Sequence, residues 1–312
     1  MLTIFTTAKP FRGHIGIIQR NALKSWTLLH PDVEIILFGD DEGAAGVCAE
    51  YGLRHESHCE RNEHGTKRLD YIFDRAQEIA RHDILCYSNC DIILMADFCS
   101  AARKVGAKHP QFLMVGRRWD TDITDPVNFS AGDWQSDVIR RAIVANHQQT
   151  ECYIDYFAFS RGLYLRKIPP LVIGRVFWDN WLIWCATGLG IPVVDASAVV
   201  LAVHQNHDYE YHPQGKLGVW NDEQAQRNLQ LGGGWDHLRN MLDATEVLRV
   251  DGLKPNWISY WLTSKRCIAW AGRFLRFEVW DPVLFFFLDI TRPIRSALGL
   301  RSTTIRRSRE KV

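Results

Sequence analysis

The stretch from Ile84 to Leu94 has the residue types and spacing best suited to chemistry in this sequence. An apolar run typical of a buried strand leads to Asn89 and Asp91, and a second apolar run follows. On an extended backbone, residues two apart face the same way, so both side-chain oxygens can meet one hard cation held against a diphosphate. The competing interpretation is that Asp91 only caps a turn while Asn89 bonds the local backbone.

The tripeptide Asn89-Cys90-Asp91 resembles the Asp-x-Asp motif of the GT-A fold glycosyltransferases, the nucleotide-diphospho-sugar transferase family. The departure is Asn89, which is neutral and leaves the motif with one fewer negative charge. The resemblance implies that Asp91 holds Mn²⁺ or Mg²⁺ and that a nucleotide-diphosphate sugar is the donor substrate. It covers roughly residues 1–230 and rests on the order of several motifs more than on any one of them.

The donor-binding residues follow from that resemblance. The loop after the first strand matches the place where the family seats the nucleotide, and Asp40 ends the second strand, where family members bond the base. Arg68 and Asp70 begin a helix and are implied contacts of phosphate and ribose, and Lys216 is an implied contact of phosphate. The implied set is Thr6, Thr7, Lys9, Asp40, Arg68, Asp70, Asn89 and Lys216. For each residue the alternative is a surface charge or a helix-capping role.

Two carboxylates are candidates for the general base on the acceptor side. The resemblance implies a carboxylate after the acceptor strand, and Asp179, which opens a Trp-rich helix, is the first choice. Asp155, at the start of a segment that resembles the acceptor-side strand, is the second choice. The alternatives are a helix N-cap for Asp179 and a strand-end hydrogen bond for Asp155.

Two late histidines complete the implied metal site. Many family members supply a late His as a further metal ligand, and His204 and His207 follow a predicted strand at a suitable distance downstream. A neutral imidazole can serve as that ligand. The alternative is that both are surface-loop histidines.

The elements that must position these residues are predicted from hydrophobic periodicity. The predicted strands are 2–6, 33–38, 83–88, 112–117, 153–159, 192–195 and 199–204, and the predicted helices are 12–26, 44–51, 68–81, 177–187 and 222–231. The β-α-β-α alternation of the first half indicates parallel strands covered by helices. Ligands bind outside the carboxyl ends of such strands. We therefore expect an α/β fold, a GT-A-like Rossmann-type mixed sheet flanked by helices, with a C-terminal helical appendage.

The glycine triplet 232–234 is the best candidate for a domain boundary. It separates a predicted transferase domain, residues 1–231, from an aromatic and basic helical region, residues 235–312. The last 22 residues hold seven basic side chains and one acid, a net charge of +6, which leaves −5 for the rest of the chain. The C-terminal region fits either a segment that binds an anionic membrane surface or a helical cap followed by a frayed tail.

Composition excludes several classes of protein. The chain has 312 residues, 46% hydrophobic and 23% charged, and no apolar run long enough to span a bilayer. The mildly acidic body argues against a nucleic-acid partner. The start of the chain has no signal-peptide pattern, and the eight cysteines contain no Cys-x-x-Cys pair, so we expect a cytoplasmic protein. Contact with the inner face of the membrane stays an open expectation.

The expected function is transfer of a sugar to a hydroxyl of a glycan or lipid-linked glycan, by an inverting or a retaining route. A non-catalytic nucleotide-sugar-binding scaffold of a polysaccharide assembly is the main alternative, and it is favoured by the neutral Asn89. A sugar-1-phosphate nucleotidyltransferase is less favoured, because the loop after the first strand lacks its Gly-rich sequence.

Overall fold

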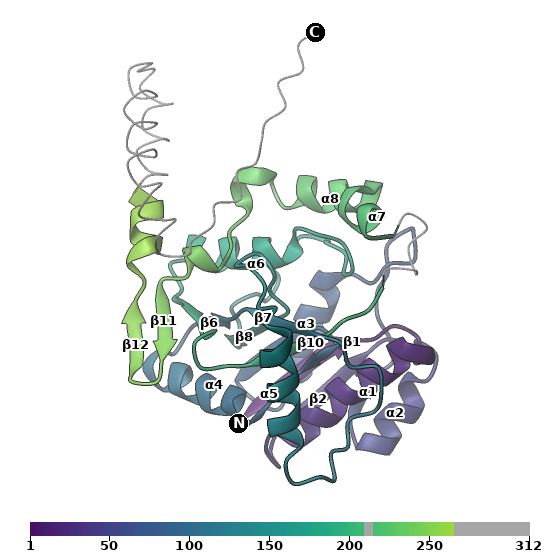
Figure 1. Ribbon diagram of the computed structural model, residues 1–312. Helices are drawn as coiled ribbons and strands as arrows, with labels where there is room; N and C mark the ends of the chain where they lie inside the picture. The colour runs from purple at the N-terminus through teal and green to yellow at the C-terminus, as the bar shows by residue number, and fades with distance from the viewer. Residues whose placement is uncertain (209–214, 265–312) are drawn as a thin grey trace. The chain divides into compact units, whose positions relative to one another are not determined.

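The computed structural model describes residues 1–208 and 215–264 (Figure 1). Within them, nine strands form one sheet in the order β12-β11-β9-β6-β8-β4-β1-β2-β3. The bounds are β1 (Leu2–Thr7), β2 (Glu34–Phe38), β3 (Arg54–Glu56), β4 (Ile84–Ser88), β6 (Leu113–Val115), β8 (Tyr156–Ser160), β9 (Val193–Asp195), β11 (Glu246–Arg249) and β12 (Gly252–Pro255). β1 runs parallel to β2 and β4, whereas β8 runs antiparallel to β4 and β6. The predicted mixed α/β sheet is therefore confirmed.

A second, three-stranded sheet has the order β5-β10-β7. It consists of β5 (Ile92–Ile93), β10 (Ala202–Gln205) and β7 (Arg118–Thr121). β10 pairs antiparallel with β5, where His204 faces Ile92, and parallel with β7, where His204 faces Asp120. Three segments far apart in the sequence therefore meet at one place, directly after the end of β4.

Helices cover both faces of the main sheet (Figure 1). Their bounds are α1 (Gly13–Thr27), α2 (Ala44–Tyr51), α3 (Leu69–Ile79), α4 (Ala96–Lys108), α5 (Trp134–Ala145), α6 (Trp178–Gly188), α7 (Gly215–Asn221) and α8 (Glu223–Leu231), with short 3-10 turns η1 (Trp235–His237) and η2 (Met241–Asp243). Sequence periodicity predicted α1, α2, α3, α6 and α8 to within two residues at each end. It did not predict α4, α5 or α7. No helix in the described ranges is long and apolar enough to cross a membrane.

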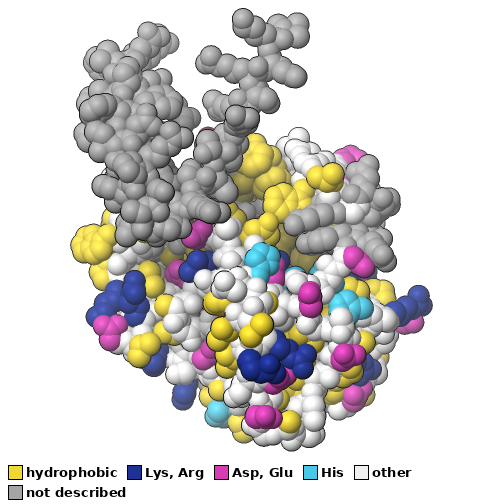
Figure 2. Space-filling view, viewed as in Figure 1, with side chains coloured by type: hydrophobic (Ala, Val, Ile, Leu, Met, Phe, Trp, Pro, Cys, Tyr) yellow, Lys and Arg dark blue, Asp and Glu magenta, His cyan; other side chains and the backbone are white. Residues whose placement is uncertain are grey.

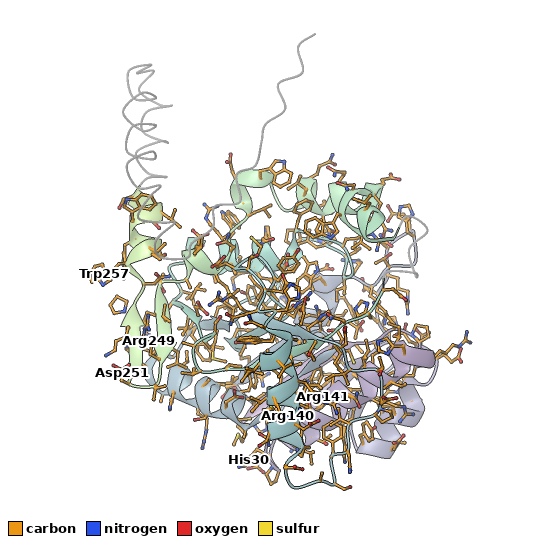
Figure 3. The ribbon with its side chains drawn as sticks, in the orientation of Figure 1. His30, Arg140, Arg141, Arg249, Asp251 and Trp257 are labelled. Atoms are coloured by element: carbon orange, nitrogen blue, oxygen red, sulfur yellow. The ribbon has the colours of Figure 1, made fainter. Side chains whose placement is uncertain are left out.

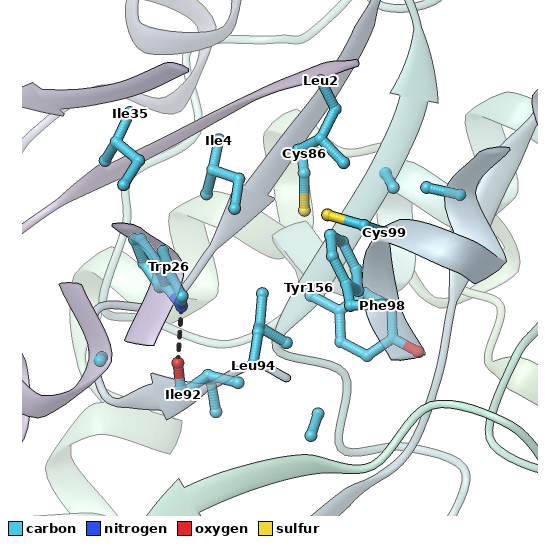
Figure 4. Close-up of a cluster of buried hydrophobic side chains, with 14 of the residues drawn as sticks. Leu2, Ile4, Trp26, Ile35, Cys86, Ile92, Leu94, Phe98, Cys99 and Tyr156 are labelled. Carbon is cyan, nitrogen blue, oxygen red and sulfur yellow. Dashed lines mark hydrogen bonds between the residues drawn. The ribbon is translucent and has the colours of Figure 1, made fainter. Parts of the chain in front are cut away.

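Alternation along the strands divides the core into two clusters. Leu2 and Ile4 of β1 belong to a cluster with side chains of α1, α2 and α4, whereas Phe5 belongs to a cluster with side chains of α3 and α6. Successive strand residues point to opposite faces, so the two clusters lie on opposite sides of the sheet. In the first cluster the buried Trp26 donates from Nε1 to the carbonyl of Ile92, at 2.9 Å (Figure 4). This bond fixes the backbone next to Asp91.

The chain divides into two compact units, Met1–Tyr260 and Trp261–Val312. β11 and β12 follow the glycine triplet 232–234, and β11 joins the main sheet beside β9. Residues 257–264 are helical. The rest of the expected C-terminal helical appendage and the basic tail lie outside the described residues.

Candidate active site

All three predicted metal-site residues meet in the structure. One ligand atom each from Asp91, His204 and His207 lies within 4.8 Å of the others. Oδ2 of Asp91 is 3.3 Å from Nε2 of His207 and 3.9 Å from Nε2 of His204. In the space-filling view, histidine, acidic and basic side chains are visible near the middle of the displayed face (Figure 2).

Nδ1 of each imidazole lies near an oxygen atom of a residue other than Asp91. Nδ1 of His204 lies 3.2 Å from Oδ1 of Asp120, and Nδ1 of His207 lies 2.6 Å from the carbonyl oxygen of Asp208. The carbonyl oxygen of Asp208 can only accept, so Nδ1 of His207 carries a hydrogen, whereas Nδ1 of His204 makes no hydrogen bond with a described residue. A hydrogen bond from the second ring nitrogen is the usual way in which a metal-binding histidine is oriented, and His207 has one.

The residues present fit a divalent cation. Oδ1 of Asp91 is buried and accepts no hydrogen bond from any described residue. Burial alone would raise the pKa of Asp91, but the neighbouring His207, His204 and Lys9, when they are protonated, hold that pKa well below its ordinary value. An ionised carboxylate and two imidazoles that have released their Nε2 protons form a donor set for a transition metal such as Mn²⁺.

The end of β1 forms the neighbouring wall. Gln19 of α1 accepts from the backbone N–H of Lys9 at 2.6 Å and donates to its carbonyl at 2.9 Å, which fixes the loop. Burial lowers the pKa of the Lys9 ammonium, although the charges of Asp91 and Asp208 act in the opposite direction. A cationic side chain is therefore held beside the metal cluster.

Asn89 and Asp155 contact each other, and Asp155 also contacts Arg118, which was not predicted from the sequence. Nδ2 of Asn89 donates to Oδ1 of Asp155 at 2.5 Å, and Arg118 donates from its terminal NH1 to Oδ2 at 2.7 Å. Nε of Arg118 donates to Oδ1 of Asp120 at 2.8 Å. Asp155 is 6% exposed, and both of its oxygens are occupied by these donors.

Asp179 lies in a different environment at the same pocket. It sits in the first turn of α6, and its Oδ1 accepts from the backbone N–H of Asn180 at 2.9 Å. Burial raises the pKa of Asp179 to about 7, and the negative charge of Asp155 acts in the same direction. The predicted N-cap role does not apply, because Phe177 occupies that position.

These side chains line one pocket of about 240 Å³. Its polar and charged lining residues are Thr7, Lys9, Gln19, Tyr87, Asn89, Asp91, Arg118, Tyr153, Asp155, Arg175, Asp179, His204 and His207. Trp178 and Trp220 add aromatic surface. Metal-type ligands, a cationic side chain and a carboxylate with a raised pKa therefore share one concave site, which is the usual composition of an active site.

Other predicted donor-binding residues lie elsewhere. Asp40 is exposed and pairs with Arg61 at 2.9 Å. Arg68 and Asp70 pair with each other, and Arg68 lines a second pocket. Thr6 is buried and bonds the carbonyl of the next residue. These four predicted residues are not among those that line the 240 Å³ pocket. Lys216 belongs to α7, and its side chain is outside what the structure describes.

Sequence reasoning missed several residues of the site. Arg118 and Asp120 lie on β7, a strand of four residues that carried no recognised motif. Arg175 lines the pocket and donates to Asp222, the N-cap of α8, at 2.6 Å. The signal in the sequence was the spacing of Arg118 and Asp120, two residues apart and therefore on one face of a strand. That spacing indicates a site only once β7 is known to pair with β10, which carries His204.

Comparisons with known proteins were made for the whole chain. No family model and no curated protein sequence matches it. Residues 1–349 of S. aureus TarS, in complex with UDP-GlcNAc, have a TM-score of 0.43 and 11% identity, covering 66% of this chain and 59% of that one. Glucosyl-3-phosphoglycerate synthase from Mycobacterium tuberculosis, with Mn²⁺, UDP and glucosyl-3-phosphoglycerate, has a TM-score of 0.41 and 14% identity, covering 75% and 80%.

The mannosyltransferase PcManGT from Pyrobaculum calidifontis, with GDP-Man and Mn²⁺, has a TM-score of 0.40 and 13% identity, covering 65% of this chain and 56% of that one. The present chain thus spans less than two thirds of the TarS and PcManGT chains. The similar structures include nucleotide-sugar glycosyltransferases, the family that the sequence resembles. Since these TM-scores are below 0.5, only the residues of this chain support the function proposed for it.

The geometry of the cluster predicts that His207→Ala weakens Mn²⁺ binding by at least about tenfold, because one of three ligand atoms is lost. Titration calorimetry of the metal-free protein with MnCl₂ measures this. His30→Ala (Figure 3) is the matched control, since His30 is not among the residues that line the pocket and its side chain is 40% exposed. Equal Mn²⁺ affinity for wild type and His207→Ala would remove His207 from the metal site.

Proposed function

We propose that this chain is a glycosyltransferase that moves a sugar from a nucleotide-diphosphate donor to an acceptor hydroxyl. The observation that carries the proposal is the cluster of Asp91, His204 and His207 in the pocket that also contains Lys9 and Asp179. Such a transfer has two needs. The leaving diphosphate must be stabilised as it gains negative charge, and the acceptor hydroxyl must lose a proton.

The leaving-group side of the pocket is the metal cluster. Asp91, His204 and His207 would hold the divalent cation, which when bound stabilises the charge that grows on the leaving diphosphate. Two imidazoles and one carboxylate form a softer donor set than the all-oxygen set that Mg²⁺ prefers, so we expect Mn²⁺ to serve better than Mg²⁺. Lys9 adds a fixed positive charge at the same wall, in a site partly shielded from water.

Asp179 is the better of the two candidate bases. A base must offer a lone pair to the acceptor proton, and both oxygens of Asp155 already accept hydrogen bonds from Arg118 and Asn89. Asp179 has a pKa of about 7, which suits proton transfer near neutral pH. Use of a separate base favours an inverting reaction.

The main alternative is a scaffold that binds nucleotide sugars without turning them over. The neutral Asn89 is the observation in its favour. The scaffold hypothesis predicts tight nucleotide binding with no release of sugar, whereas the transferase hypothesis predicts both binding and turnover.

The first test is Mn²⁺-dependent turnover of a panel of UDP- and GDP-sugars by the full chain, followed as release of the nucleoside diphosphate. We expect turnover with Mn²⁺, weaker turnover with Mg²⁺, and loss of at least about a hundredfold in Asp91→Ala, because the leaving group then lacks its cation. Nucleotide binding by wild type without any turnover would establish the scaffold instead.

The second test concerns Asp179 and pH. Because the ionised form is the base, kcat/KM of wild type should rise as pH increases through about 7. Asp179→Asn should lower kcat by about 10²–10⁴ and remove that limb. Asp137→Asn is the control and should keep that limb, since Asp137 lies in α5, outside the pocket, and pairs with Arg140 and Arg141 (Figure 3).

The same carboxyl has a consequence for stability. The folded-state pKa of Asp179 lies above the unfolded value, so the fold disfavours its ionised form. Its contribution to the free energy of unfolding is greatest below about pH 4 and is lost as pH rises toward about 7. The difference in the free energy of unfolding between wild type and Asp179→Asn should therefore change over that pH window. In the kinetic test, a rise of kcat/KM with pH that persists in Asp179→Asn would exclude Asp179 as the base.

The acceptor side extends the proposal to a glycan or lipid-linked glycan at a membrane surface. Trp257 is 76% exposed and Tyr260 53% exposed, at the start of the aromatic and basic region. Exposed aromatic residues near basic ones suit the interface of an anionic bilayer. Flotation with phosphatidylglycerol vesicles should retain the full chain but not a chain ending at residue 256. Equal flotation of both would remove the membrane part.

A further inference from the structure

Trp235 is a large apolar side chain that the fold leaves in contact with solvent. It begins the short turn η1 and is 67% exposed. Its ring meets the ring of Phe177 in a T-shaped contact, with the ring centroids 5.2 Å apart. Phe177 is the N-cap of α6 and stands between Val176 and Trp178, both of which line the 240 Å³ pocket. Trp235 therefore packs against the segment that also carries Asp179, the proposed base.

The glycine triplet 232–234 forms the turn that leads into Trp235. Gly233 and Gly234 have φ angles of 91° and 82°, in the left-handed region that glycine adopts most readily. A Cβ on Gly233 would overlap the imidazole of His237, which fills the space beside this glycine. The same imidazole stacks on Trp184 of α6, with the ring centroids 3.8 Å apart. The triplet is thus a tight turn that fixes η1 against α6.

Hydrogen bonds hold the residues after η1 on the start of α6. The backbone N–H of Arg239 donates to the carbonyl of Asn180 at 3.2 Å. Nδ2 of Asn180 donates to the carbonyl of Arg239 at 2.7 Å. Because Asn180 is the residue after Asp179, these two bonds fix the position of η1 relative to the proposed base.

Phe177 has a backbone conformation that is unusual for its residue type. Its φ is 86° and its ψ is −25°, in the left-handed region that a residue with a Cβ seldom adopts. Such strain persists only where the surrounding structure holds it, and it is concentrated at binding and catalytic sites. Glycine would relieve the strain, but it would also remove the ring against which Trp235 packs. The strained residue and the exposed indole are therefore parts of one feature.

An exposed indole at the edge of a polar pocket suits a sugar ring. One face of a pyranose carries C–H groups and is apolar, whereas the rim of the ring carries hydroxyls. An aromatic face can cover the apolar face, and polar side chains can bond the hydroxyls. Asp236, the residue after Trp235, is exposed, and the neighbouring pocket is lined by charged side chains. A wholly apolar ligand would cover these groups without offering them hydrogen bonds.

We propose that Trp235 and Phe177, here called the aromatic corner, bind a sugar ring of the acceptor, which stacks on the exposed indole. A ring bound there lies at the wall of the pocket that carries Asp179, where the acceptor hydroxyl loses its proton. The inference rests on the proposed function and names carbohydrate as the class of acceptor. Its test therefore measures saccharide binding separately from turnover.

Two other ligands are rivals for an exposed tryptophan. The nucleobase of the donor could stack on the indole, since every base has an aromatic face. A bilayer could receive the indole at its interface, where tryptophan is enriched. The three explanations differ in the probe to which Trp235 responds, which is a saccharide, UDP or a lipid vesicle.

The first experiment is ¹⁹F NMR of the full chain labelled with 5-fluorotryptophan, with Trp235→Phe used to assign the signal of Trp235. The probes are cellobiose, lactose, N,N′-diacetylchitobiose and mannobiose, with glycerol as a polyol that has no ring. We expect at least one saccharide to shift the signal saturably and glycerol to leave it unchanged. No response to any of these saccharides would overturn the proposal. A response to UDP with Mn²⁺, or to phosphatidylglycerol vesicles, in place of the saccharides would also overturn it.

The second experiment uses the saccharide that shifts the signal as the acceptor in the transfer assay. Trp235→Ala should raise the KM for that saccharide about 3–10-fold, because a stacking contact is lost. The KM for the donor and the hydrolysis of the donor by water should not change. Trp235→Phe should restore most of the lost affinity, since a phenyl ring also has an aromatic face.

Leu189→Ala is the matched control for these kinetics. Leu189 is an apolar residue at the other end of α6 and is 48% exposed, so its removal should leave the acceptor KM unchanged. An acceptor KM that is the same in wild type and Trp235→Ala would overturn the proposal. A parallel rise in the KM for donor and acceptor would assign Trp235 a structural role instead.

Failure of the proposed function would give a different result from failure of the aromatic corner. Saccharide binding at Trp235 without turnover of any nucleotide sugar would keep the carbohydrate site and remove the transferase activity. Turnover of a nucleotide sugar while Trp235 responds to no saccharide would keep the transferase and remove the aromatic corner.

Discussion

The pairing of β10 with β5 and β7 is the constraint on which the site depends. β10 places His204 opposite Ile92, the residue after Asp91, and opposite Asp120. A shift of one residue in this register would turn the imidazole to the other face of the sheet and separate it from both carboxylates. Trp26 holds the carbonyl of Ile92 from within the core, so the position of β5 is tied to the packing of α1.

Charge balance explains why the pocket is built in this way. Asp91, Asp120 and Asp155 are carboxylates with little exposure, and burying such groups is costly unless each is paired. Arg118 is shared by Asp120 and Asp155. Asp91 lies beside two imidazoles, which are cationic only when they are protonated. Its Oδ1 accepts no hydrogen bond from a described residue. A divalent cation at this point would complete the balance that Arg118 provides for the other two.

Local sequence patterns predicted those strands and helices whose formation depends mainly on their own residues. Strands β1, β2 and β4 are short apolar runs between polar loops, and α1 has a regular apolar stripe, so their existence could be predicted. Helix α5 has exposed Ile143 and Val144, which obscure such a stripe. Residues of β7 acquire a role only through pairing with β10, more than eighty residues downstream, and no local pattern records that pairing. The assignment of Asp40, Arg68 and Asp70 rests on motif order alone and stays a prediction; in the structure their charges pair with nearby groups.

Two carboxylates in one pocket are given different properties by their surroundings. Asp155 accepts from Arg118 and Asn89, so its charge is compensated and its oxygens are occupied. Asp179 forms no ion pair within the described part of the chain, and burial beside Asp155 raises its pKa to about 7. An ionised Asp155 is needed to hold Arg118, and its charge also makes Asp179 more basic. Asp155 therefore links the two sides of the pocket, since its removal would disturb both Arg118 and the proposed base.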